Sequence, residues 1–367
     1  MSPSSPDGSP VAGPPSLATS RRPPPGDQAP RAAVPYAGGG GTPTRRAVWL
    51  DPVLRAVPGV ARSFWYDMRR HLRFGGVFVR GATPNAAAAR LTKAAHSIEK
   101  GLSLPEPRPG FGPPAVARLR THLADYVARF GRDRTAAIAA RTLCAYEDFN
   151  RRQDLAASDL PEFLAALGFP EGRMGDEGGV RELRREEVLR HARIDFDAFA
   201  RHRFSIRHFA PEPVAPALVE RAVETALFTP SVCNRQGWRV HLFHGREQVS
   251  RALSFQNGNR GFGHEVDTLL LVSADLESFS VNGERNQGWI DGGLFCMSLV
   301  FALHSLGLGT CMLNCSMSGE GERALRGALG VPDSEAVVMM IAVGHLSGEF
   351  RVTHSARKAV EDVLVVH

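Results

Sequence analysis

Three apolar segments in the last third of the chain limit the fold more than any other feature of the sequence. Residues 268–273 and 336–343 are short and almost continuously apolar, which is typical of buried strands. Residues 288–306 are apolar over the length of a long helix, so we expect this helix at the centre of the fold or at a subunit interface. Together they predict a domain of mixed helices and strands.

Other patterns in the same part of the chain extend this domain. Apolar residues at helical spacing predict helices over residues 213–228 and 320–329. Alternation of apolar and polar residues predicts a strand over residues 238–243. We therefore expect one mixed domain over residues 195–367.

The rest of the chain has two regions of different composition. Residues 1–46 contain eleven of the 26 prolines and a run of four glycines, and such a segment buries too little apolar area to fold, so we predict a disordered tail. Residues 47–190 are predicted to be mostly helical. The expected elements there are helices over residues 86–100, 114–130 and 135–150, a Pro/Gly loop over 105–114 and a Gly-rich linker over 168–185.

Charge and cysteine usage argue against several classes of protein. The net charge of +6 comes almost entirely from arginines spread along the chain, whereas a nucleic-acid-binding protein gathers basic and aromatic residues on one element. We find neither the ~20 apolar residues that cross a bilayer nor the pattern of a signal peptide. The five cysteines form no C-x-x-C pair, which favours a reducing cytoplasm without a disulfide framework or a metal site. P-loop and Rossmann glycine motifs are also absent from the sequence.

The first candidate for binding chemistry is the run Arg-Phe-Ser-Ile-Arg at residues 203–207. If this run is extended, Arg203, Ser205 and Arg207 lie on one face. Two guanidiniums and a hydroxyl would then meet one small anion such as a phosphate. Taken alone, the run is also typical of an exposed basic strand, and that alternative stays open.

A polar turn, residues 229–237, separates a predicted helix from a predicted strand. Asn234 and Gln236 carry carboxamides, which both donate and accept hydrogen bonds and therefore suit the edge of a flavin or another heteroaromatic ring. A turn that bonds its own backbone is the alternative. Three further elements follow along the chain: a polar loop at 256–261, a possible short strand at 306–315, and the basic pair at 357–358.

In this order, the elements resemble the nitroreductase-like family of FMN-dependent oxidoreductases. The family's motifs are R-x-S-x-R/K, P-V, A-x-x-x-P-S-x-x-N-x-Q-x-W, D-x-G, A-x-x-x-L-G-L-G, and a strand ending in glycine before a basic pair. They are matched at residues 203–207, 213–214, 226–238, 291–293, 302–309, 343–344 and 357–358. Gly237 departs from the pattern, because the family usually has proline there. The resemblance covers about residues 195–367.

The resemblance implies residues that hold the phosphate end of FMN. Arg203, Ser205 and Arg207 would bind the phosphate and the ribityl chain. Arg357 would close on the same phosphate.

The resemblance also implies residues that reach the flavin ring. Ser231, Asn234 and Gln236 would approach the FMN, often that of the partner subunit. Asn259 would meet the pyrimidine edge, and the backbone around Asn314 and Cys315 would lie over the ring near N5.

The implied fold is α+β, a mainly antiparallel sheet wrapped by helices, with an N-terminal helical segment added. The implied assembly is a cytoplasmic homodimer with two FMN sites and an exchanged C-terminal segment, without nucleic-acid or membrane partners. NADH or NADPH would reduce the flavin at N5, and an unassigned small acceptor would take the electrons in a second half-reaction. No side chain is required as a nucleophile, so we assign no catalytic residue and no metal.

Two other functions stay open. The flavin would instead dehydrogenate a biosynthetic intermediate, such as an azoline-type ring or a polysaccharide-linked sugar, with oxygen as the oxidant. Alternatively, the fold is a non-catalytic interaction protein.

The helical region has its own resemblance. Residues 96–112 are similar to a segment that precedes nitroreductase-like domains in some bacterial proteins linked to exopolysaccharide synthesis. The loop that carries Arg108 and Phe111 either shapes the acceptor site over the flavin or is a structural cap.

Overall fold

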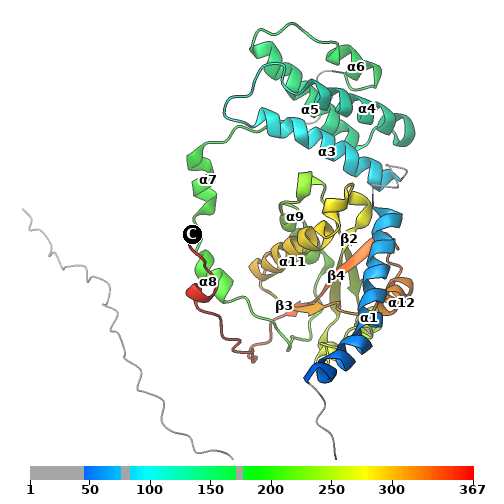
Figure 1. The fold of residues 1–367 in the computed structure, drawn as a ribbon. Coiled ribbons are helices and arrows are strands. Elements are labelled where there is room, and N and C mark those ends of the chain that lie inside the picture. Colours follow the sequence, from blue (N-terminus) through cyan, green and yellow to red (C-terminus); the bar gives the residue numbers. More distant parts are fainter. Residues whose placement is uncertain (1–44, 76–82, 171–176) are drawn as a thin grey trace, which may run out of the picture. The chain divides into compact units, whose positions relative to one another are not determined.

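The computed structural model describes residues 45–75, 83–170 and 177–367. The chain divides into two units, Met1–Leu54 and Arg55–His367, and every contact reported below lies within the second unit. Most of the predicted tail, up to residue 44, falls outside the described residues. The helix α1, Arg45–Phe74, follows it (Figure 1).

A four-stranded antiparallel sheet organises residues 238–345 (Figure 1). The order across the sheet is β1 (Trp238–His244), β2 (Thr268–Asp275), β4 (Glu335–His345) and β3 (Leu308–Asn314). Each neighbouring pair is antiparallel. The α+β fold with a mainly antiparallel sheet wrapped by helices is therefore confirmed, and the possible short strand at residues 306–315 is the edge strand β3.

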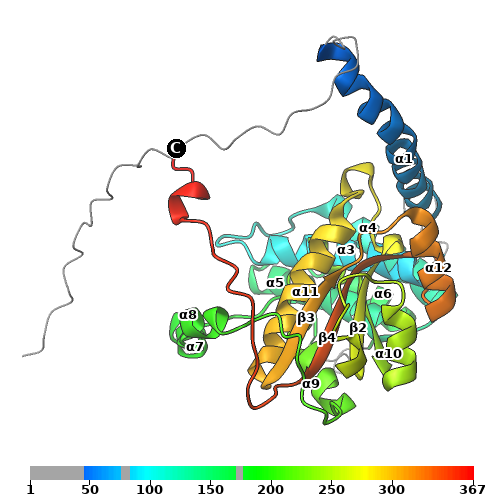
Figure 2. The same ribbon diagram turned by 90° about the horizontal axis from the view of Figure 1, so that it is seen from below.

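Helices cover both faces of the sheet, which explains why β2 is buried at every position (Figure 2). Leu270 and Val272 pack in a cluster with residues of α9 (Pro216–Ala226) and α11 (Gln287–Ser305). The alternate residues of β2 pack in a second cluster on the other face. Its helices are α10 (Arg246–Leu253) and α12 (Gly319–Leu329). A strand enclosed by two helical layers has no solvent-facing positions, so its sequence is continuously apolar.

The long helix α11 is apolar on two sides, and only one of them is buried. Phe295 and Leu299 lie against the sheet with no exposed surface, and Phe295 stacks on Trp238 of β1 with ring centroids 4.7 Å apart. On the outer side, Ile290 is 53% exposed and Leu294 is 48% exposed. The sequence predicted either a central helix or an interface helix, and the single chain shows a central helix with an open apolar face.

The helical region has a hydrophobic core of its own. Its helices are α3 (Pro84–Leu102), α4 (Pro113–Phe130), α5 (Arg134–Arg152) and the short α6 (Leu160–Ala166). The first three correspond to the helices predicted from apolar spacing. Thr83 and Asp133 cap α3 and α5, because each side chain accepts a hydrogen bond from a backbone N–H of the first turn.

Phe111, in the loop before α4, points into this helical core. Its ring lies 5.1 Å from the ring of Tyr146, whose hydroxyl donates a 2.7 Å hydrogen bond to Phe111 O. Gly101 of α3 approaches the same ring so closely that a Cβ there would lie 2.1 Å from it. Of the two interpretations of this loop, the structural one therefore applies to Phe111.

The segments on either side of the sheet region are exposed. They comprise α7 (Arg185–Ala192), α8 (Phe196–Arg201) and the C-terminal residues 346–367 with the short helix η5 (Val360–Asp362). Within the two described helices no residue is buried. Among the helices that the structure describes, none combines the length and apolarity that crossing a bilayer requires.

Candidate functional site

The run Arg203–Arg207 lies beside the edge strand β3. Ser205 pairs with Thr310 in parallel orientation, and Ile206 N donates a 2.8 Å hydrogen bond to Thr310 O. The Ile206 side chain packs in the core. Ser205 and Arg207 flank Ile206, and because neighbouring side chains of an extended segment point to opposite sides, both are directed away from that core. Phe204 is 38% exposed and Arg203 is half-buried, so this alternation does not extend to the start of the run.

This run offers a donor set for an oxyanion. Guanidiniums bind phosphate and carboxylate groups with paired hydrogen bonds, and the Ser205 hydroxyl adds a further donor. Among the residues that the structure describes, no carboxylate forms an ion pair with Arg203 or Arg207. The positive charge at this edge of the sheet is therefore available to a ligand.

The turn before β1 has an unusual backbone. φ is +50° at Cys233, +53° at Asn234 and +50° at Gln236, a left-handed region that costs about 1 kcal/mol or more for a residue with a Cβ. Gln236 N donates a 3.0 Å hydrogen bond to Ser231 Oγ, which is the local bonding that a simple polar turn would show. The carboxamides of Asn234 and Gln236 remain exposed. Such strain persists only where the surroundings hold it.

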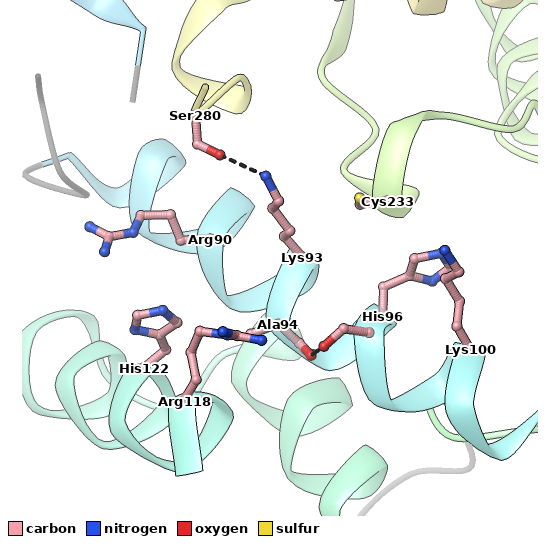
Figure 3. A pocket seen from close by; sticks show the side chains of 10 residues that line it. Arg90, Lys93, Ala94, His96, Lys100, Arg118, His122, Cys233 and Ser280 are labelled. Carbon is pink, nitrogen blue, oxygen red and sulfur yellow. Dashed lines mark hydrogen bonds between the residues drawn. The ribbon is translucent and has the colours of Figure 1, made fainter. Parts of the chain in front are cut away.

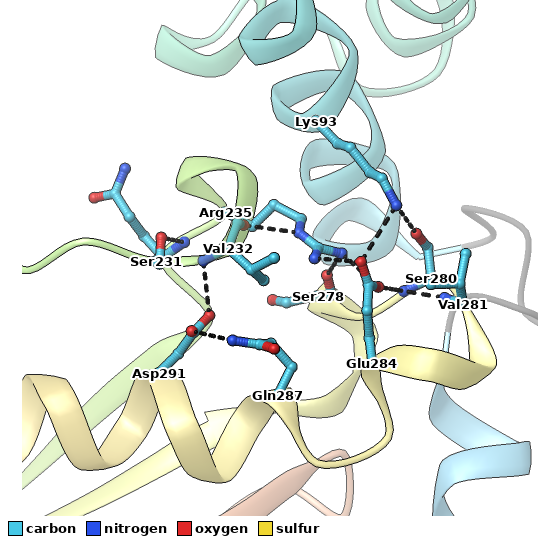
Figure 4. A network of polar contacts seen from close by, with 11 residues as sticks. Lys93, Ser231, Val232, Arg235, Ser278, Ser280, Val281, Glu284, Gln287 and Asp291 are labelled. Atoms are coloured by element: carbon cyan, nitrogen blue, oxygen red, sulfur yellow. Dashed lines mark hydrogen bonds and ion pairs between the residues drawn. The ribbon is translucent and has the colours of Figure 1, made fainter. Parts of the chain in front are cut away.

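A buried ion pair holds this turn (Figure 4). Arg235 is 7% exposed, and its guanidinium forms two hydrogen bonds of 2.8 and 3.0 Å to the carboxylate of Glu284. It also donates to Val232 O, within the turn, and to Ser278 O at 3.1 and 2.7 Å. Four hydrogen bonds from one side chain fix the backbone on both sides of the pair.

The helical region contributes to the same network. Lys93 of α3 lies 3.3 Å from Glu284 and donates a 3.1 Å hydrogen bond to Ser280 Oγ (Figure 4). Two further contacts from the start of α3 reach the segment after β2, from Thr83 to Glu277 at 2.6 Å and from Asn85 to Asp275 at 2.8 Å. Burial raises the pKa of Asp275 to about 6.

Sequence reasoning missed Arg235, Glu284 and Lys93. Arg235 stands between the two carboxamides of the turn motif, but nothing in the sequence pairs it with Glu284. Only the fold brings Lys93 to the same carboxylate, because 191 positions separate the two residues.

Asp291, from the D-x-G motif, links α11 to the turn by a hydrogen bond. Its carboxylate accepts a 3.2 Å hydrogen bond from Val232 N and a 2.8 Å hydrogen bond from Gln287 Nε2. Position 237 has too little room for a side chain, because a Cβ there would lie 2.8 Å from the Cβ of Ser278. This contact gives a physical reason for glycine where the family usually has proline.

The polar loop and the end of β3 lie together. Gln256 Nε2 donates a 3.1 Å hydrogen bond to Asn314 O, next to Cys315. Asn259 directs its Nδ2 donors at the carbonyls of Leu253 and Gln256, so only its Oδ1 remains to meet a ligand. Burial raises the pKa of Cys315 to about 11, which keeps its thiol protonated near neutral pH.

The structure thus places the expected residues in separate groups. The run Arg203–Arg207 and the end of β3 lie at the same edge of the sheet, whereas the turn Ser231–Gln236 lies before β1 on the opposite edge. Arg357 lies in the exposed C-terminal segment and donates a hydrogen bond to Ser355 O. In the described part of the chain, no group of His, Cys, Asp and Glu is arranged to hold a metal ion.

Part of the chain matches a known protein family. Residues 200–256 and 246–345 match the sequence model of the nitroreductase family. A protein named NADH dehydrogenase from Thermus thermophilus is 26% identical over 192 residues, which cover 44% of this chain and 91% of that protein. A 4-nitrobenzoate reductase from Pseudomonas putida is 22% identical, over 41% of this chain and 85% of that protein.

Solved structures of similar proteins cover the same part of the chain. An FMN-dependent nitroreductase from Clostridium difficile is 20% identical, with a TM-score of 0.39 over 46% of this chain and 98% of that chain. A nitroreductase with bound FMN from Desulfitobacterium hafniense is 21% identical, with a TM-score of 0.36 over 46% of this chain and 96% of that chain. From the family match and the motifs, residues 200–345 form a domain of the nitroreductase family, a family of oxidoreductases.

The Glu284 carboxylate should make folding sensitive to acid. Burial alone would raise its pKa, but hydrogen bonds from Arg235 and Ser280 N and the charge of Lys93 lower the pKa to about 2, from an ordinary 4.5. Because the folded value is the lower one, the ionised carboxylate stabilises the fold above pH 4.5, and this stabilisation is lost as the pH falls toward 2. We expect this group to contribute at most about 3 kcal/mol over that window.

Urea unfolding of the wild type and Glu284→Gln between pH 2 and 7 measures this effect. The variant should be less stable at pH 7 and should lose less stability on acidification. Glu224→Gln, at an exposed position of α9, is the control and should behave as the wild type. Equal pH dependence in the wild type and Glu284→Gln would contradict the assigned role.

Proposed function

We propose that the nitroreductase-family domain binds FMN and that the protein transfers electrons from NADH or NADPH to a small acceptor. The observation that carries the proposal is the clustering of Arg203, Ser205 and Arg207 in one short segment beside β3, where no described carboxylate neutralises the positive charge. This donor set fits the phosphate of a flavin mononucleotide. Bound FMN would supply hydride and electron transfer at its ring.

The protein's own residues would bind and orient the flavin. Arg203 and Arg207 would neutralise the phosphate, and Ser205 would hydrogen-bond it or the ribityl chain. The backbone at Asn314–Cys315, fixed by Gln256, would support the ring, and Asn259 would offer Oδ1 to an N–H of the ring edge. Burial raises the pKa of the Cys315 thiol to about 11 and so keeps it protonated near neutral pH, and we assign it no nucleophilic role.

A homodimer would complete the site. The exposed face of α11, the exposed helices α7 and α8, and the C-terminal segment with Val363–Val366 all present apolar side chains to solvent in the single chain. Exposed apolar side chains in such number on these elements favour protein–protein contact. In a symmetric pair, the turn Ser231–Gln236 and Arg357 of one copy would reach the flavin held by Arg203 and Arg207 of the other.

The binding of the phosphate is tested by comparing FMN with riboflavin. Arg207→Ala should weaken FMN at least about tenfold and leave the affinity for riboflavin nearly unchanged, because riboflavin lacks the phosphate. Quenching of flavin fluorescence measures both affinities. Arg201→Ala is the matched control, since Arg201 is exposed and pairs with Asp197 in α8. Equal losses for both flavins would show that Arg207 does not contact the phosphate.

The direction of electron flow is tested by anaerobic titration. The FMN-loaded protein should lose its flavin absorbance on addition of NADH or NADPH and regain it with a nitroaromatic acceptor. A bound flavin that neither nucleotide reduces would instead favour dehydrogenation of a biosynthetic intermediate with oxygen as the oxidant. A protein that binds no flavin would favour the non-catalytic alternative.

The dimer is tested on the outer face of α11. Ile290→Asp places a charge on an apolar face and should convert a dimer to a monomer in sedimentation velocity experiments. If the partner completes the site, the same variant should also bind FMN more weakly. Glu224→Asp, at an exposed position of α9, should change neither the oligomeric state nor the affinity for FMN. A monomeric wild type that binds FMN tightly would refute the shared site.

A further inference from the structure

A cavity of about 840 Å³ lies between the helical region and the turn before β1 (Figure 3). Helices α3 and α4 form one wall, and Cys233 and Ser280 form the facing wall. The volume is in the range of cavities that bind small molecules, about 300–1,000 Å³.

The wall formed by the two helices is strongly basic. The ionisable residues that line it are Arg90, Lys93, His96, Lys100, Arg118 and His122. The lining residues include no Asp or Glu. Four permanent cations therefore line one partly open cavity.

Three of these cations have no counter-charge in the part of the chain that the structure describes. Lys93 is paired with Glu284, but no carboxylate lies within ion-pair distance of Arg90, Lys100 or Arg118 there. Arg120, on the same helix as Arg118, is paired with Asp159. Unpaired arginines also occur elsewhere among the described residues, at Arg203 and Arg207 for example, so what distinguishes this set is that its members line one cavity.

Two acidic residues near the cavity interact with its histidines, but each also has partners outside the lining. Glu99 accepts hydrogen bonds from Thr142 Oγ1 and Gly179 N and contacts His96 Nδ1 at 3.3 Å. Asp125 forms an ion pair with Arg129 at 3.1 Å. The pKa of His122 is lowered by burial and by the charges of Arg90 and Arg118, which is consistent with an excess of positive charge around it.

We propose that this basic cavity binds the phosphate or pyrophosphate group of a small molecule. Two guanidiniums and an ammonium match the charge of a pyrophosphate, and arginine forms paired hydrogen bonds to phosphate oxygens. The cavity is distinct from the run Arg203–Arg207, because its cations come from α3 and α4.

The position of the cavity connects it with the reaction. Cys233 belongs to the strained turn that also carries Ser231 and Asn234, and Asn234 and Gln236 line a smaller cavity of about 260 Å³ on the side of α3 and α5. The helix α3 thus contacts both sides of the turn. This step rests on the proposed function: if the turn reaches a flavin, the ligand of the basic cavity is a reactant, either the nicotinamide dinucleotide or a phosphorylated acceptor.

Calorimetric titration of the FMN-loaded protein with inorganic pyrophosphate tests the cavity. The double variant Arg90→Ala/Arg118→Ala should bind pyrophosphate at least about tenfold more weakly than the wild type. Arg152→Ala, at the exposed end of α5, removes one arginine outside the cavity and should bind as the wild type. Arg118 is exposed, so Arg118→Ala alone serves if the double variant does not fold, as judged by circular dichroism.

Arg207→Ala separates this cavity from the flavin phosphate site. Unchanged pyrophosphate affinity in the cavity variants, or a loss confined to Arg207→Ala, would overturn the proposal. If the purified protein binds no flavin, the same titration without FMN still tests the cavity, so failure of the proposed function is distinguished from failure of the cavity.

The two sources of the phosphate are separated by the reductive half-reaction. If the cavity holds the dinucleotide, Arg118→Ala should raise the apparent dissociation constant of NADH or NADPH in anaerobic stopped-flow reduction about tenfold. If pyrophosphate binding falls while reduction is unchanged, the cavity serves a phosphorylated acceptor. Both results support a phosphate site.

Discussion

The buried ion pair between Arg235 and Glu284 is the interaction on which the geometry of the candidate site depends. It joins the turn before β1 to the segment after β2. It also holds the left-handed backbone of Cys233, Asn234 and Gln236, which would otherwise relax to a less strained conformation. A buried pair of this kind is costly to break, because loss of one partner leaves a desolvated charge, at about 3–5 kcal/mol. The strained turn therefore has a defined conformation before any ligand arrives.

The Glu284 carboxylate also links the helical region to the sheet region. Lys93 extends from α3 to Glu284, and Thr83 and Asn85 add hydrogen bonds at the start of that helix. The helical region is thus more than an appended cap, because its polar contacts converge on the segment that supports the turn. Its basic cavity lies at the same junction, with Cys233 in one wall.

The sequence predicted elements better than it predicted contacts. The apolar run of β2 follows from burial on both faces, and α11 is apolar both on its buried side and on its exposed side, so the pattern of apolar residues alone was enough to place the two elements. The polar turn was predicted from its own residues, but its strained backbone was not, since a positive φ at Cys233 or Gln236 is not expected for such residues. The partners Lys93, Arg235 and Glu284 depend on tertiary contacts between distant segments, which leave no periodic signal.

The hydrogen bonds from α3 also determine whether the family domain can be separated from the rest of the chain without changing it. A version that begins near residue 195 would match the family region but would lack Lys93, Thr83 and Asn85. Asp275, Glu277 and Glu284 would then lose their donors from α3, and the surface that α3 covers would become accessible to water. The family domain isolated in this way would lose one positive charge and two neutral donors beside its own turn, so its properties would not represent those of the intact protein.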